Sequence, residues 1–322
     1  MGLEPLHCYG YPIFPLLPFF VLLRTALRLI ASALERNICL NIPHDPEKLW
    51  CARMKNSERI FNQLREEAEN DPNIIGFFLG GSRGKGFATE HSDYDVFVIV
   101  KDGFFKSFVR LLREKFPVHD YYKWIEDAAE KLEVKDFGSV IVVSFSQFEK
   151  TAPVGSPDDW GRYNYTHLRV LVDKNGEIQK LVDHKGTIEK EKVHDYVSAR
   201  LDGYINSVYR SLKCFRDGNN VGARLEAADS VRYFLNVIFG LEGRITPYYK
   251  YLEWELERFP LKKLKMKPKE IVRSLLHILE DADVKTQKRL LELTEVACRR
   301  EGYGDVFDDW GPDLVWIKTF AQ

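Results

Sequence analysis

The sequence predicts an α+β protein in which a small mixed-sheet domain precedes an all-α helical bundle. Two observations lead to this fold class. Short runs of β-branched and aromatic residues, bounded by turn residues, indicate strands in the first half of the chain. From Val193 onward, apolar residues instead recur every three or four positions, which is the period of an amphipathic helix. The change of period after Ile188 sets the expected boundary between the two domains.

The expected sheet domain covers residues 54–187. We predict, in chain order, helix 57–69, strand 74–79, a short helix from 82 to about 88, strand 94–100, helical segments 106–116 and 121–132, strand 140–145 and strand 168–173. Ser57 is a typical N-cap residue and precedes the apolar pair Ile60 and Phe61, so we expect the first helix to begin there. The turn residues Asp173-Lys174-Asn175-Gly176 are expected to end the last strand.

The expected helical bundle covers residues 188–322. The predicted helices are 193–215, 223–239, 248–258, 269–281 and 285–301. The segment Asp217-Gly218-Asn219-Asn220 ends the first of them and Gly240 ends the second, since both are typical of helix termini. Consecutive amphipathic helices with short connections bury their apolar faces against one another, which predicts a bundle.

The overall composition is that of an ordinary globular protein. Its 47 Lys and Arg residues are balanced by 48 Asp and Glu residues, so no general attraction to nucleic acid or to a membrane is implied. The five cysteines are scattered and include no C-x-x-C pair, which favours a reducing cytoplasm over a disulfide framework. No histidine pair has the spacing of a zinc site, so zinc is not expected. No oligomeric state is predicted.

Residues 1–53 form an apolar N-terminal extension. The uncharged run Pro12–Leu23 is followed by Arg24 and is too short for a helix that spans a membrane, so no span is expected. The extension contains Ala31-Ser32-Ala33, which has the form of a signal-peptide cleavage site, but no basic residue precedes the apolar core. Our hypothesis is that Met54 is the natural start and that the extension is not native. A docking helix and an export signal are the alternatives.

The segment with the most chemical information is Gly80–Gly86 (GGSRGKG) together with Asp93-Tyr94-Asp95. Residues two apart on a strand point to one face of the sheet, so Asp93 and Asp95 are expected to lie side by side. Adjacent carboxylates repel unless a divalent cation lies between them. Their oxygens suit Mg²⁺, which keeps several waters and takes further ligands from phosphates. The glycine turn offers backbone N–H groups that can bind phosphate oxygens. Together the two motifs predict nucleotidyl transfer.

Gly81-Ser82, a gap of ten residues and then Asp93-x-Asp95 in an apolar frame resemble the signature of the nucleotidyltransferase superfamily, which includes DNA polymerase beta and the aminoglycoside nucleotidyltransferases. The resemblance is specific over about residues 74–100. It implies a nucleoside triphosphate, usually ATP, two Mg²⁺ ions, and transfer of the nucleoside monophosphate to a hydroxyl group. A sheet domain followed by a helical bundle also resembles the aminoglycoside-type members. That likeness implies a small-molecule acceptor, with its pocket in the helical domain.

The resemblance also implies roles for individual residues. Asp93 and Asp95 would be the catalytic residues and the metal ligands. The expected nucleotide-binding residues are Gly80, Gly81, Ser82, Arg83, Lys85 and Lys250. Arg83 and Lys85 are equally typical of a solvated loop. Lys250 lies with Arg244 in a segment of cations and tyrosines, which is also typical of packing between domains.

The sequence departs from the family at one position. Members usually carry a third carboxylate on a neighbouring strand, but strand 140–145 has none, and Ser144 stands where an acid is expected. Glu149, Asp136 and Asp173 are near in sequence, although none is central in an apolar strand. The third acid therefore comes from another place, or the second metal site is weak, or the protein is inactive.

Two other functions stay open. Transfer onto tRNA or a protein, as in toxin-type members, is favoured by a run of lysines that can bind phosphates, namely Lys262, Lys263, Lys265, Lys267 and Lys269. Such runs are more often solvated linkers, so nucleic acid is a minor expectation. A catalytically inactive nucleotide-binding regulator is favoured by the missing third acid. Glu226 is either a general base or, as we prefer, one half of an ion pair.

Overall fold

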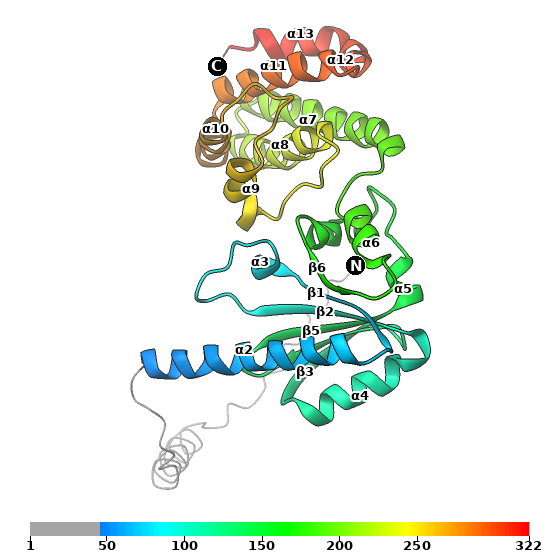
Figure 1. Cartoon of the computed structure of the whole chain (residues 1–322). Coiled ribbons are helices and arrows are strands. Elements are labelled where there is room, and N and C mark those ends of the chain that lie inside the picture. Colours follow the sequence, from blue (N-terminus) through cyan, green and yellow to red (C-terminus); the bar gives the residue numbers. More distant parts are fainter. Residues whose placement is uncertain (1–45, 322) are drawn as a thin grey trace, which may run out of the picture. The chain divides into compact units, whose positions relative to one another are not determined.

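The computed structural model describes residues 46–321 of the chain (Figure 1). The predictions made for residues 1–45 lie outside this range. The chain divides into two compact units, Met1–Ala52 and Arg53–Gln322, and the fold given below is that of the second unit. The predicted boundary between a sheet domain and a helical bundle near residue 188 stays a prediction.

The described residues form a six-stranded mixed sheet with the strand order β3-β4-β5-β2-β1-β6. Its strands are β1 (Ile74–Leu79), β2 (Tyr94–Val100), β3 (Val118–Ile125), β4 (Ala129–Val134), β5 (Gly138–Ser144) and β6 (Val170–Asp173). β2 and β5 run parallel, whereas the other neighbouring strands are antiparallel. Together with the helical C-terminal region, this sheet confirms the α+β class.

One face of the sheet packs against two helices, α2 (Pro46–Asn70) and α4 (Phe105–Lys115) (Figure 1). Apolar residues spaced by three and four on each helix, such as Leu64 and Phe108, are buried against Phe77 and Val98 of the strands. The other face is covered by α5 (Phe145–Glu149) and α6 (Ile178–Lys185). Phe97 and Ile99 of β2 point to this second face, so Asp95, two residues earlier, shares it.

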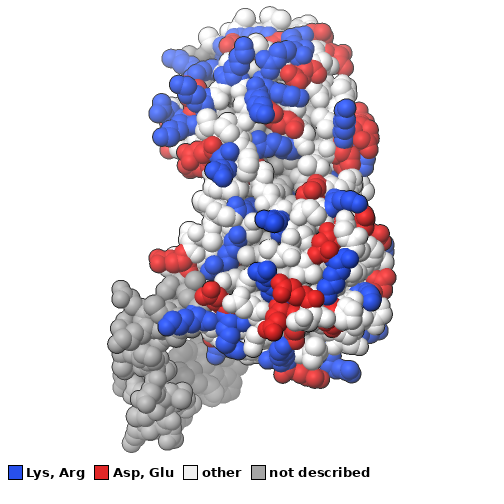
Figure 2. All heavy atoms as spheres, in the orientation of Figure 1, with Lys and Arg blue, Asp and Glu red and all other residues white. Residues whose placement is uncertain are grey.

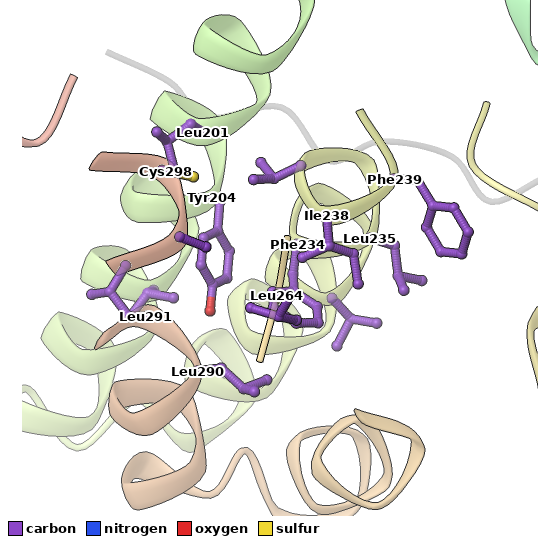
Figure 3. Close-up of a cluster of buried hydrophobic side chains, with 14 of the residues drawn as sticks. Leu201, Tyr204, Phe234, Leu235, Ile238, Phe239, Leu264, Leu290, Leu291 and Cys298 are labelled. Atoms are coloured by element: carbon purple, nitrogen blue, oxygen red, sulfur yellow. The ribbon is translucent and has the colours of Figure 1, made fainter. Parts of the chain in front are cut away.

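The C-terminal region is helical. Its helices are α7 (Val193–Arg216), α8 (Asn220–Leu241), α9 (Leu252–Arg258), α10 (Pro268–Asp281), α11 (Val284–Arg300), α12 (Gly304–Asp309) and α13 (Gly311–Thr319). Short 3₁₀ helices occur at η1 (Asp102–Phe104), η2 (Pro157–Tyr165), η3 (Lys190–Lys192) and η4 (Tyr249–Tyr251). Figure 3 shows the core of this region, where Tyr204, Phe234 and Leu291 from three helices converge. All helices predicted after residue 188 are confirmed, with ends shifted by a few residues.

α7 and α8 pack closely because glycine residues lie at the contacts between the two helices. A methyl group added at Gly203 of α7 would lie 2.6 Å from the ring of Tyr233, and one added at Gly240 of α8 would lie 2.9 Å from Val197. The earlier residue Val197 of α7 meets the later residue Gly240 of α8, and Gly203 meets Tyr233. The two helices therefore run antiparallel.

Three local predictions are wrong. Residues 121–132 are not helical, because they form most of the hairpin β3–β4. Asp127, which lies in the turn of this hairpin, has a φ of 60°. Ser57 does not cap a helix, since α2 already begins at Pro46; the Ser57 hydroxyl instead donates a hydrogen bond to the carbonyl oxygen of Asp136 at 2.6 Å. The helix expected from 82 to about 88 is the single turn α3 (Gly81–Gly84).

None of the helices in residues 46–321 combines the length and the apolar character that crossing a lipid bilayer requires.

Candidate active site

The glycine turn lies directly against the carboxylate of Asp95. The N–H group of Gly80 donates to the carbonyl oxygen of Asp95 at 2.7 Å, which continues the pairing of β1 with β2. Gly81 follows at φ +56°, and a methyl group at this position would lie 2.2 Å from Asp95 Oδ2. A residue without a side chain is therefore required here on two grounds, backbone conformation and space. The sheet brings the turn and the acid together.

The single-turn helix α3 presents its first N–H groups at this place. The N–H groups of Gly81, Ser82 and Arg83 belong to the first turn, which has no acceptor within the helix. A methyl group at Gly84 would lie 1.9 Å from the carbonyl oxygen of Leu79, so the turn closes tightly on the end of β1. This arrangement can bind the oxygens of an anion such as a phosphate.

The carboxyl group of Asp95 lies in a partly buried and strongly charged environment. Burial raises its pKa, and the negative charge of Asp93 acts in the same direction. The charge of Lys131, the neighbouring Ser139 hydroxyl and the charge of Lys250 oppose this rise of the pKa. Asp93 itself is exposed. A cation bound at the pair would stabilise both carboxylates.

The two aspartates fit magnesium by the chemistry of their oxygens. Among residues 46–321, no group of three or more His, Cys, Asp or Glu side chains has the geometry of a metal site. Mg²⁺ is nevertheless commonly held by one or two carboxylates, with water and substrate phosphates as its other ligands. Asp93 and Asp95 therefore suit a metal that arrives with a triphosphate.

The strands beside β2 show what replaces the expected third acid. β5 places Ser139 opposite Asp95, and β4 places Glu133 opposite Ser139. The Ser139 hydroxyl donates to Glu133 Oε2 at 3.2 Å, and Lys131 Nζ lies 2.6 Å from Glu133 Oε1. A further carboxylate thus shares the row of Asp95, but it lies one strand beyond β5 and is paired with a lysine.

The sequence candidates for the third acid have other positions. Ser144 pairs with Val100 at the opposite end of β2 from Asp95. The carboxylate of Asp173 accepts hydrogen bonds from the N–H groups at the start of α6. Glu149 is the last residue of α5, and Asp136 lies in the turn between β4 and β5.

Lys85 anchors the glycine turn to the interior. Its ammonium group is buried and donates to the carbonyl oxygens of Tyr163 and Thr166 at 2.9 and 2.5 Å, and to Thr166 Oγ1 at 2.9 Å. These three bonds use all three hydrogens, so none remains for a phosphate oxygen. Arg83 Nε donates to the carbonyl oxygen of Ser92 at 2.9 Å, and its guanidinium lies 4.2 Å from the centre of the Tyr94 ring.

The Lys85→Met substitution is expected to destabilise the protein by about 2–4 kcal/mol, because buried carbonyl oxygens lose their donors. Burial lowers the pKa of Lys85 to about 8, and Glu255 partly opposes this shift. Between about pH 8 and 10.5, Lys85 is neutral in the folded protein and charged in the unfolded chain, so unfolding takes up a proton. The contribution of Lys85 to the free energy of unfolding therefore rises with pH in that window. Thermal unfolding should show the difference in melting temperature between wild type and Lys85→Met widening from pH 8 to pH 10.

Lys106→Met, at an exposed lysine, is the control. An unchanged melting temperature for Lys85→Met would contradict the anchoring role.

Two other candidate residues are engaged in structure. Arg244 donates to the carbonyl oxygen of Phe259 at 2.8 Å and forms an ion pair with the buried carboxylate of Glu255. Glu226 lies 2.5 Å from Arg210, so it forms the ion pair that we preferred to a catalytic role. Lys250 lies 4.8 Å from the centre of the Tyr251 ring, and its charge acts on Asp95.

The lysine run is partly built into the helical region. The backbone N–H groups of Lys262 and Lys263 donate to Glu242 Oε1, and the Lys263 ammonium donates to the carbonyl oxygen of Leu241 at 2.6 Å. On the face drawn in Figure 2, basic side chains gather over the upper, helical part of the molecule, with acidic side chains among them. Contact of the lysines with nucleic acid stays a prediction.

Comparison with known proteins bears on this site. Residues 58–152 match the family model of the nucleotidyltransferase domain. This match includes the glycine turn and both aspartates, and it places residues 58–152 in the nucleotidyltransferase superfamily. A crystal structure of a nucleotidyltransferase-like protein from Exiguobacterium sibiricum 255-15 has a TM-score of 0.36 and 11% identity, covering 81% of this chain and 78% of that chain. At that TM-score the likeness does not bear on the assignment. No curated protein matches the chain.

Proposed function

We propose that the protein is a magnesium-dependent nucleotidyltransferase, which transfers a nucleoside monophosphate, AMP from ATP, to a hydroxyl group of a small molecule. The observation that carries the proposal is the contact of Gly81 with the Asp95 carboxylate, inside the segment that matches the nucleotidyltransferase domain. An aminoglycoside-like acceptor is the one that the sequence resemblance implies. Because the reaction consumes ATP, we propose a cytoplasmic location.

In this proposal Asp93 and Asp95 hold magnesium, while the N–H groups of Gly81, Ser82 and Arg83 bind phosphate oxygens. The metal, when bound, offsets the triphosphate charge and lowers the pKa of the acceptor hydroxyl. The positive charge of Lys250 acts to lower the pKa of Asp95. The acceptor oxygen forms a bond to the α-phosphorus as the bond from that phosphorus to the oxygen bridging to the β-phosphate breaks. Pyrophosphate leaves with this electron pair, and the hydroxyl proton passes to water.

The first test is binding of ATP with Mg²⁺, followed by release of pyrophosphate. At about 100 times the dissociation constant, the ligand should raise the melting temperature by roughly 5 °C. Pyrophosphate release with one member of a panel of small hydroxyl compounds would support the proposal. Transfer of label from ATP to tRNA or protein would support the macromolecular alternative. Binding with no turnover on any acceptor would favour the regulatory alternative, and no thermal shift at all would contradict nucleotide binding.

A further inference from the structure

A cavity of about 760 Å³ lies at the segment that carries Lys250. Four parts of the chain line it, namely the stretch before and within η2, α7, α8, and residues 245–250. The side chains on which its chemistry depends are Trp160, Tyr196, Arg200, Arg232, Tyr249 and Lys250.

The close packing of α7 and α8 builds one wall of the cavity. Tyr196 and Arg200 are four residues apart on α7, and Arg232 and Asn236 are four apart on α8, so each pair shares a helix face. The antiparallel crossing, fixed by the glycines at 203 and 240, brings the two faces to the same cavity. The wall is thus formed by regular secondary structure.

The lining is basic. Among the described residues of the cavity, Arg200, Arg232 and Lys250 are positively charged and Asp159 is negatively charged. Asp159 is engaged through one oxygen, because its Oδ2 accepts from the N–H group of Gly155 at 2.7 Å, whereas its Oδ1 lies 4.0 Å from Arg162 and has no hydrogen-bond partner. A ligand with several positive charges would therefore be repelled, whereas an anionic group would be attracted.

The two arginines are placed to meet such an anion. The guanidinium of Arg200 lies 4.3 Å from the centre of the Tyr196 ring, which orients its planar donor group. Arg232 is paired with Asp229 at 3.7 Å, but both side chains are more than half exposed. Such a surface pair contributes little and can be exchanged for a ligand anion.

Aromatic side chains in the same cavity remain open to solvent. Trp160 is 70% exposed and Tyr249 is 64% exposed, which is unusual for such large rings. Trp160 is held edge-on against Tyr248 at 4.7 Å between ring centres. Exposed aromatic rings beside convergent polar groups are typical of a ligand site that covers a ring or another apolar surface.

We infer that this cavity binds the acceptor, and that the acceptor carries an anionic group, a phosphate or a carboxylate, in addition to its hydroxyl. The inference rests on the proposed function and replaces the aminoglycoside-like acceptor with an anionic one. The cavity is connected to the glycine turn by packing, because the ring of Tyr248 in its lining lies 5.1 Å from the ring of Tyr163, and the carbonyl oxygen of Tyr163 accepts a hydrogen bond from Lys85 of that turn at 2.9 Å. The triphosphate is assigned to the glycine turn, which leaves the cavity for the second substrate.

Calorimetric titration of sugars that differ in charge tests this inference. The probes are glucose, glucosamine, glucose 6-phosphate, glucuronate and kanamycin, added to the full chain with Mg²⁺ and the non-hydrolysable analogue AMPCPP. We expect glucose 6-phosphate or glucuronate to bind at least about tenfold more tightly than glucose and glucosamine, since an arginine–anion pair contributes a charge-assisted hydrogen bond. The two anionic probes distinguish a phosphate from a carboxylate.

Matched variants locate the binding. Arg200→Ala and Arg232→Ala should weaken binding of the anionic sugar about tenfold or more and leave AMPCPP affinity unchanged. Arg216→Ala on α7 and Arg224→Ala on α8, at exposed arginines outside the cavity lining, should change neither. Glucosamine or kanamycin binding as tightly as the anionic sugars would overturn the inference. Loss of AMPCPP affinity in the Arg200 and Arg232 variants would also overturn it, since the cavity would then hold the nucleotide.

The sugar titrations are repeated without nucleotide, so that sugar binding to the cavity is tested independently of nucleotide binding. If AMPCPP fails to bind the wild type, the proposed function is contradicted. The preference of the cavity for anionic sugars, and its loss in the two arginine variants, is still measured in that case.

Discussion

Replacing Gly81 by alanine is expected to reduce nucleotidyl transfer by about 100-fold or more. The added methyl group would lie 2.2 Å from Asp95 Oδ2, so the carboxylate must move away from the position that the sheet gives it. A displacement of about 1 Å at a reacting group is enough to cost about 100-fold in rate. The positive φ of Gly81 adds roughly 1–2 kcal/mol of backbone strain. Steady-state kinetics with ATP and an acceptor, together with thermal unfolding, measure the two effects.

Gly86 supplies the matched control. It has a similar φ of +69°, but a methyl group there would meet nothing within 4 Å. Gly86→Ala should therefore lose a similar amount of stability and retain most of its activity. If both variants lose activity equally, backbone strain explains the defect, and the contact of Gly81 with Asp95 is not the important feature.

Replacing Asp95 by asparagine is expected to reduce turnover by at least about 10³-fold and, in the absence of metal, to stabilise the fold. Burial and the charge of Asp93 raise the pKa of the Asp95 carboxyl, so ionising this group costs more in the folded protein than in the unfolded chain. The uncharged amide avoids that cost. Thermal unfolding at neutral pH without metal should give a higher melting temperature for the variant.

The stability that Asp95→Asn gains over wild type should increase with pH. The folded pKa lies above the unfolded value, so the folded protein holds its proton to higher pH and the contribution of Asp95 to stability falls as pH rises through that window. The advantage of Asp95→Asn should thus be absent in acid and present at neutral pH. Asp195→Asn, at an aspartate whose side chain is 95% exposed, is the control. A variant that is less stable than wild type at neutral pH, or that keeps its turnover, would contradict this description of the site.

The local parts of the site could be predicted from sequence because local rules specify them. β1 and β2 are short segments rich in β-branched and aromatic residues, and the glycines that follow β1 indicate a tight turn. Alternation along a strand then fixes Asp95 on the face opposite Val96. No information from distant residues is needed for this step, and the structure agrees with it.

The hairpin β3–β4 could not be predicted in the same way. Seven residues of β3, from His119 to Ile125, are exposed, so the strand shows no alternation of buried and exposed positions. The aromatic residues Tyr121 and Trp124 are spaced as on a helix. Pairing of β4 with β5, a contact set by tertiary structure, decides the conformation instead. Because 121–132 was predicted to be helical, the position of Glu133 opposite Ser139 was missed.

The role of Lys85 was also inaccessible to local rules. Its acceptors belong to Tyr163 and Thr166, which lie 78 and 81 residues further along the chain. A lysine in a glycine-rich turn is as typical of a phosphate-binding loop as of a solvated one. Neither reading includes the buried anchor that the structure shows.

The most direct test of the central claim is calorimetric titration of AMPCPP into wild-type protein and into the Asp93→Asn/Asp95→Asn double variant, with Mg²⁺ and with EDTA. If the glycine turn and the two aspartates form a magnesium–triphosphate site, affinity should fall at least about tenfold when Mg²⁺ is removed and by a similar factor in the folded double variant. Equal affinity of wild type and double variant in the presence of Mg²⁺, or affinity unaffected by EDTA, would contradict the claim.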